Sequence, residues 1–219
     1  MLLHSLLVAH IAVLGYWLGS ELVINANFRF VTRAAGQPFV ERDRLLDHVL
    51  DVDQHVRYAL ILQTGLGTAL AALLGYLPGG RLLAITAGVA AVAWLVLVEA
   101  THRLRKTPTG RWLETLDGIV RYSVMLVLVV VGVGALAGAW PLATWLAIKL
   151  ALFAGVILCG LGIRLSIVRY YLTWRDIEQA GSTPINEREL WRRYCNATAV
   201  LIVLWVLIAG IVGLSLVKA

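Results

Sequence analysis

The stretch AHIAVLGYWLGSELVINANFRFV (residues 9–31) is apolar enough to cross a bilayer, yet it holds a histidine and a glutamate before its first arginine. A plain apolar helix would anchor the chain at lower cost, because ionisable groups are unfavourable inside a membrane. The stretch therefore predicts a membrane-spanning helix and, in addition, a structural or chemical role for His10 and Glu21.

The rest of the chain has the same apolar character. Of its 219 residues, 60% are hydrophobic and only 15% are charged, whereas an average soluble domain has about 25% charged residues. The apolar residues form runs close to or above the roughly 20 residues that cross a bilayer. We predict an all-α polytopic membrane helix bundle that forms a single transmembrane domain over residues 1–219. Its six spans lie at about 2–24, 56–77, 82–101, 117–139, 142–163 and 196–216.

Two of the links between spans are very short. The segment LPGGR (77–81) joins the second and third spans, and AWP (139–141) joins the fourth and fifth. Glycine and proline stop one helix and start the next. Each of these pairs of spans is therefore predicted to be an antiparallel hairpin.

The basic residues gather on one side of the predicted membrane. Loops 25–55, 102–116 and 164–195 hold nearly all the lysines and arginines, while the opposite side has only Arg81 and Lys218. The positive-inside rule places these loops in the cytoplasm and both chain termini outside. We predict a multi-pass protein of the bacterial inner membrane. The net charge of +6 is then explained by these loops, and nucleic acid is not expected as a partner.

A short motif recurs at the entrances of the spans. DQHVRY (53–58) opens the second span, DGIVRY (117–122) opens the fourth, and a fainter RRY (192–194) precedes the sixth. The two hairpins therefore look like copies of one unit. Such repeats frame a binding site in many transporters. Alternatively, Arg and Tyr simply mark the cytoplasmic interface.

The segment 40–55 has apolar residues at helical spacing. It predicts an amphipathic helix on the cytoplasmic surface, or an extension of the second span.

Two ionisable residues are predicted at similar depth in the outer half of the membrane. His10 lies about 13 Å from the chain start along a helix, and Lys149 lies about 12 Å past Pro141. A neutral histidine can ligate a metal or haem iron, and a buried lysine can exchange protons or pair with an anionic group. The alternative is that His10 bonds a backbone carbonyl and Lys149 extends towards the surface.

Two glutamates are predicted in the cytoplasmic half. Glu21 and Glu99 lie at a depth comparable with Arg57, Arg121 and Arg164. Ion pairs between spans explain them, and a proton relay is the functional alternative.

Histidines near the predicted cytoplasmic side suggest a second place for a metal. His48, Asp51 and His55 share one helical face, which is compatible with a metal ion and also with a solvated face. His55 and His102 lie at similar depth, where they could clamp a haem or a metal.

Two stretches carry a family resemblance. HIAVLGYWLGSELVINANFR (10–29) has a histidine followed by Trp17 and Gly19, and WLAIKLALFAGVILCGLGIRL (145–165) has a lysine in a KLALF context. They resemble the small bacterial membrane proteins that include the copper-resistance CopD family and the HemJ type of protoporphyrinogen oxidase. Arg121 and Ser123, followed by Lys149, fit the order of the CopD family. In the HemJ type, the first-span histidine and the later-span lysine are the functional pair, so the resemblance implies haem b with His10 and Lys149 at those positions.

Three functions remain open. The first is a haem b membrane oxidoreductase or electron-transfer subunit that acts on porphyrin or quinone, with His10 as axial ligand and Lys149 as the catalytic, proton-handling group. The cofactor contacts assigned to it are His10, Trp17, Arg57 and Arg121, and the candidate metal ligands are His10, His55 and His102. The second is transport of copper or another metal, with few soft ligands to support it. The third is a structural or assembly subunit, with lipids and a homo-oligomer or a larger membrane complex as partners.

Overall fold

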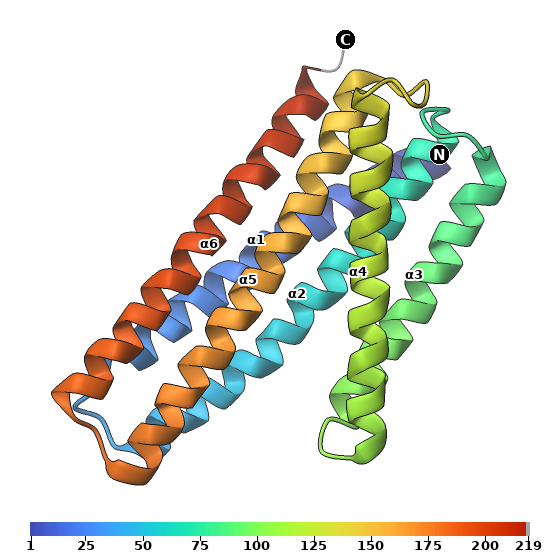
Figure 1. Cartoon of the computed structure of the whole chain (residues 1–219). Helices are drawn as coiled ribbons and strands as arrows, with labels where there is room; N and C mark the ends of the chain where they lie inside the picture. Colours follow the sequence, from blue (N-terminus) through green and yellow to red (C-terminus); the bar gives the residue numbers. More distant parts are fainter. Residues whose placement is uncertain (218–219) are drawn as a thin grey trace. The chain divides into compact units, whose positions relative to one another are not determined.

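The computed structural model describes residues 1–217, apart from the side chain of Leu50, and this part of the chain is helical throughout except for short connections. Figure 1 labels its helices. Their bounds are α1 (Leu2–Arg33), α2 (Phe39–Leu73), α3 (Gly80–Arg103), α4 (Pro108–Leu136), α5 (Thr144–Ala180) and α6 (Pro184–Leu216). All six are long and apolar enough to cross a membrane. The predicted all-α polytopic helix bundle is confirmed, and the chain is a multi-pass membrane protein.

Most helices extend well past the predicted spans. Helix α5 has 37 residues, which corresponds to about 55 Å, whereas the hydrocarbon core is about 30 Å thick. The predicted loops 25–55 and 164–195 are therefore mostly helix and contain only the short connections 34–38 and 181–183. Residues 40–55 were predicted to form either a separate amphipathic helix or an extension of the second span. They form the extension, because α2 runs unbroken from Phe39 to Leu73.

Two helices end earlier than the predicted spans. Helix α2 ends at Leu73 rather than at 77, and α4 ends at Leu136 rather than at 139. At each end a glycine takes a left-handed conformation, Gly75 with φ 78° and Gly138 with φ 81°. The amides that follow close back onto the last turn in the Schellman pattern. The two short hairpins thus share one type of helix stop.

The charged start of α6 has its own cap. The Thr183 hydroxyl accepts a hydrogen bond from the Asn186 amide, and the Asn186 side chain accepts one from the Thr183 amide. Pro184 follows at the first helical position, where its missing N–H costs nothing. The predicted span 196–216 leaves these first turns outside the hydrocarbon.

The chain forms two compact units. Unit 1 comprises Met1–Ile24 and Leu50–Val124, and unit 2 comprises Asn25–Val49 and the chain from Met125 onwards. In unit 1, the side chains of Ile61, Trp94 and Val98 form a buried cluster between α2 and α3. Helices α2 and α3 approach closely there, since a Cβ added to Gly65 would lie 2.6 Å from the Cβ of Ala91.

In unit 2, helices α5 and α6 run side by side along much of their length (Figure 1). Glycines of α5 make room for large side chains of α6. A Cβ on Gly155 would lie 3.2 Å from Leu207, and one on Gly162 would lie 3.3 Å from Val200. Small residues at such positions let membrane helices pack closely.

A buried ion pair joins four helices of unit 2. The Arg42 guanidinium, 2% exposed, donates to both carboxylate oxygens of Glu187 at 2.7 and 3.0 Å. Its Nε donates to the Val31 carbonyl at 3.1 Å, and it lies over the ring of Trp174. Burial by itself would raise the pKa of Glu187, but the hydrogen bonds from Arg42 and Ser182 and the charge of Arg42 hold that pKa below its ordinary value. We call this group the Arg42 clamp.

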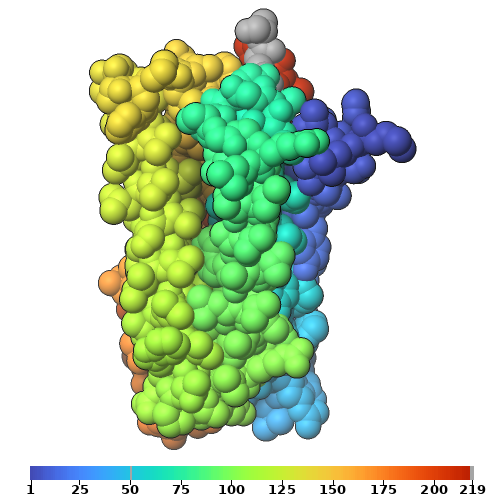
Figure 2. Space-filling view, turned by 90° about the vertical axis from the view of Figure 1, so that its right-hand side faces the viewer, coloured from blue at the N-terminus to red at the C-terminus, as the bar shows by residue number. Residues whose placement is uncertain are grey.

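The outer surfaces of the helices suit lipid. Figure 2 shows the face that α3 presents, in green. Along α3 the exposed apolar residues recur every three or four positions, at between 61% and 72% exposure: Leu82, Ile85, Val89, Val92 and Val96. In water such a stripe would be unfavourable, whereas hydrocarbon solvates it without cost.

The repeated motif forms the same ion pair three times. Arg57 pairs with Asp53 at 3.3 Å, and Arg121 pairs with Asp117 at 2.6 Å. Before the sixth span, Arg193 pairs with Glu189 at 2.7 Å. The RRY echo is therefore a third copy, and its acidic residue is a glutamate four positions before the arginine.

Candidate functional site

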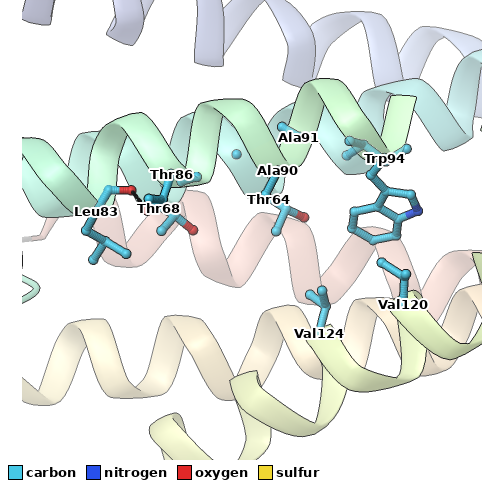
Figure 3. Close-up of a pocket in the computed structure, with 12 residues that line it drawn as sticks. Thr64, Thr68, Leu83, Thr86, Ala90, Ala91, Trp94, Val120 and Val124 are labelled. Atoms are coloured by element: carbon cyan, nitrogen blue, oxygen red, sulfur yellow. Dashed lines mark hydrogen bonds between the residues drawn. The ribbon is translucent and has the colours of Figure 1, made fainter. Parts of the chain in front are cut away.

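Unit 1 contains a cleft between α2, α3 and the first half of α4. Its volume is about 370 Å³. Figure 3 shows side chains of all three helices pointing towards it. The twelve lining residues are Ile61, Thr64, Gly65, Thr68, Leu83, Thr86, Ala87, Ala90, Ala91, Trp94, Val120 and Val124. From Leu83 to Trp94 the wall formed by α3 spans about 17 Å, so the cleft is elongated along the helix.

The walls are apolar apart from three threonines and one tryptophan. The Thr64 hydroxyl donates to the Leu60 carbonyl at 2.8 Å. The Thr86 hydroxyl donates to the Leu83 carbonyl at 3.0 Å (Figure 3). Thr68 lies one turn after Thr64 on α2. The lining therefore includes three threonines within an otherwise hydrocarbon surface.

Trp94 forms one end of the cleft, with its indole between α3 and the Val120 and Val124 side chains of α4 (Figure 3). Its Nε1–H donates to Asp117 Oδ1 at 2.8 Å. Asp117 is 1% exposed, and its other oxygen accepts from Arg121 at 2.6 Å. A buried carboxylate that accepts from one cationic donor and one neutral donor has a partner for each oxygen. The pair therefore fixes the plane of the Trp94 ring.

A separate set of polar contacts ties α1, α2 and α3 together. The Tyr16 hydroxyl bonds His55 Nδ1, and the His55 ring lies edge-on to Tyr58. The Tyr58 hydroxyl donates to Glu99, which also accepts from Arg103. The residues include tyrosine, histidine and glutamate, the types that carry protons in membrane proteins. None of the five lines the cleft.

His10 and Trp17 lie in unit 1, and His10 contacts α2. The His10 ring packs on Gly67, where an added Cβ would lie 3.3 Å from its Cε1 atom, and the His10 carbonyl accepts from Gln63. Trp17 is buried and donates from Nε1 to Glu21 at 3.3 Å within the same helix. Glu21 thus accepts a hydrogen bond from a tryptophan of its own helix, whereas the sequence suggested an ion pair with an arginine of another span.

The other predicted ligands have separate partners. Arg57 and Arg121 are each paired with an aspartate of their own helix. His55 bonds Tyr16, whereas His102 lies 4.0 Å from Asp51. Within residues 1–217, no three histidine, cysteine, aspartate or glutamate side chains are placed to hold a metal ion together.

Lys149 belongs to unit 2. Its Nζ donates to the Ser215 hydroxyl at 2.8 Å and lies 5.6 Å from the centre of the Trp145 ring. His10 belongs to unit 1, so the two residues of the predicted pair lie in different units.

The sequence reasoning missed the cleft. Its lining comes from three helices, with Thr64 and Thr68 on α2, Thr86 and Trp94 on α3, and two valines on α4. The signal that could have found it is the small-residue segment TGLGT (64–68), because glycine and threonine in a span permit close packing and supply hydroxyls.

Comparison of the chain with known protein families, with curated proteins and with solved structures gives no match.

Proposed function

We propose that the protein is a membrane subunit of an electron-transfer or oxidoreductase system in the bacterial inner membrane, and that it takes a lipophilic redox ligand of the quinone class from the bilayer. The ligand occupies the cleft of unit 1. The resemblance to the CopD and HemJ type supports the redox class, and the cleft supports the kind of ligand.

The observation that carries the proposal is the combination of an elongated apolar cleft with hydroxyl oxygens on its walls. An acyl chain needs no polar partner, whereas a ring that bears oxygen atoms gains from one or two polar groups placed in an apolar pocket. The cleft of about 370 Å³ provides them through Thr64, Thr68 and Thr86. A quinone-class ring with part of its apolar tail matches this pattern.

Haem b stays a separate prediction, because the cleft does not suit it. Its lining includes no histidine, methionine, cysteine or lysine, so it offers no axial ligand to haem iron. The histidines predicted as haem ligands, His10, His55 and His102, all lie outside the lining of the cleft. The proposed binding of a quinone-class ligand does not depend on haem.

The test is direct binding of a short-chain quinone to the purified protein in phosphatidylcholine nanodiscs, with empty nanodiscs subtracted. Ala90→Phe should abolish binding, because Ala90 lines the cleft and a phenyl ring would fill it. The matched control is Val89→Phe, since Val89 is the neighbouring residue of α3, lies outside the lining and is exposed. Equal binding by the two variants, or no binding above empty nanodiscs by the unaltered protein, would contradict the proposal.

A further inference from the structure

The cleft is closed at one end and open along one side. At the closed end the side chains of Ile61, Trp94 and Val98 form a buried cluster, with exposed fractions of 1%, 7% and 1%. Further along α3, Thr86 and Ala90 line the cleft and are also exposed at the surface of the helix. A ligand from the bilayer can therefore enter beside Thr86 and Ala90, but it cannot pass Trp94.

The size of the lining side chains changes along the cleft. Leu83 lies at one end and Trp94 at the other (Figure 3). Of the twelve lining residues, Trp94 is the aromatic one. Between the two ends the lining includes small residues of α2 and α3: Gly65, Ala87, Ala90 and Ala91. The middle thus suits a thin chain, and the closed end offers a flat aromatic surface.

The Trp94 ring is held in place. Its Nε1–H donates to Asp117 Oδ1 at 2.8 Å, and Asp117 in turn accepts from Arg121 at 2.6 Å. In Figure 3 the indole nitrogen lies on the side away from the other lining residues of α3, so the carbon part of the indole is turned to the cleft. What a ligand meets at this end is therefore an apolar, aromatic stop.

We infer that a quinone-class ligand enters this cleft ring first, and that Trp94 is the residue against which the ring rests. The tail then leads out past Thr86 and Ala90 into the bilayer. The inference rests on the proposed function and adds the orientation of the ligand and the residue that positions its ring. It depends on shape and aromatic contact, and not on which threonines donate or accept.

The closed end excludes the opposite orientation for a long ligand. The wall that α3 forms spans about 17 Å, so a tail longer than this cannot lie in the cleft ahead of the ring and end at Trp94. A ring at Trp94 leaves the tail free to extend into hydrocarbon. Indole is electron-rich and a quinone ring is electron-poor, and contact between aromatic rings corresponds to about two- to tenfold in affinity beyond the area that they bury.

The first experiment tests the orientation with the unaltered protein in phosphatidylcholine nanodiscs. Quinones that share one ring carry tails from a methyl group to a prenyl chain longer than the cleft, and affinity is expressed against the concentration of each ligand in the bilayer. Because the tail leaves the cleft, the longest ligand should bind at least as tightly as the shorter ones. Loss of binding once the tail exceeds the length of the cleft would show that the tail enters first. That result overturns the inference and leaves the proposed function standing.

The second experiment tests the contact with Trp94. Each quinone is compared with the saturated diketone of the same ring and tail, which keeps both carbonyl oxygens but is not flat. Trp94→Leu should lower the affinity for the quinone about two- to tenfold and the affinity for the diketone by less. Trp94→Phe keeps an aromatic ring and should retain more of the quinone affinity. The matched control is Trp112→Leu, which should change neither affinity, because Trp112 lies on α4 in the same unit, is 64% exposed and lies outside the lining.

The outcomes separate the two claims. If Trp94→Leu lowers the affinity for both ligands equally, or for neither, the ring does not rest on Trp94 and the inference is overturned. Thermal unfolding verifies that each variant is folded, and if Trp94→Leu is not, Trp94→Phe and the tail series decide. If no ligand of the series binds above empty nanodiscs, the proposed function fails and the inference fails with it.

Discussion

Replacing Arg42 with methionine should cost the protein a large part of its stability. The change removes two hydrogen bonds to Glu187, one to the Val31 carbonyl, and the contact with the Trp174 ring. Among the described residues, the Glu187 carboxylate would keep Ser182 as its side-chain donor, and it is 13% exposed. Removing one partner of a buried pair costs about 3–5 kcal/mol, most of it from the charge left behind. We expect a loss in that range.

The assay is the free energy of unfolding in mixed micelles of a mild detergent and dodecyl sulfate, followed by far-ultraviolet circular dichroism. Arg44→Met is the matched control, because Arg44 lies on the same helix but is exposed. It should change stability by less than about 0.5 kcal/mol. The double variant Arg42→Met with Glu187→Leu should recover to within about 1 kcal/mol of the unaltered protein, since no charge is left unpaired.

Two results would refute this reasoning. If Arg42→Met costs no more than Arg44→Met, the ion pair contributes nothing measurable. If the double variant is as unstable as the single one, the loss comes from the contacts with Val31 and Trp174 rather than from an unpaired carboxylate.

Three further predictions follow from other parts of the chain. Because the pKa of Glu187 is lowered in the folded protein, its ionised form stabilises the fold at pH values above the ordinary pKa of 4.5. This stabilisation is lost as the pH falls through the pKa of the folded state, so unfolding midpoints should drop in acid and Glu187→Gln should make that drop smaller. Gly65→Val should destabilise the protein by about 1–3 kcal/mol, because a Cβ there meets Ala91 at 2.6 Å, whereas Gly88→Val, with open space around it, should be near neutral on the same unfolding assay. If haem b is bound through His10, the oxidised and reduced visible spectra of the extracted protein should show it and His10→Ala should remove it; spectra without a Soret band would contradict the haem prediction.

The sequence predicted the fold well because the fold depends on quantities that are local in the chain. Apolar runs of about membrane length are visible without any knowledge of contacts. Helix ends were less accurate, since Gly75 and Gly138 stop α2 and α4 through their left-handed conformation. The predicted stops relied instead on the proline and glycine a few residues later.

The candidate site could not be predicted in the same way. Depth in the membrane can be counted along a helix, and this count suggested the pair of His10 and Lys149. It does not say which helices are neighbours. The cleft depends on that information, because Thr64 and Thr86 line one cavity only through the close approach of α2 and α3 at Gly65. Each threonine alone is an ordinary residue of an apolar helix.

The three acidic–arginine pairs show how a repeat can serve two purposes. Asp53 and Glu189 are 34% and 29% exposed, which suits the interpretation that arginine and tyrosine mark the cytoplasmic interface. Asp117 is 1% exposed because Trp94 of α3 covers it and donates to it. Only this copy therefore reaches into the interior, where it holds the ring at the end of the cleft. A motif shared by three helices has become part of a site in one of them, and the burial of its carboxylate, rather than its sequence, identifies which one.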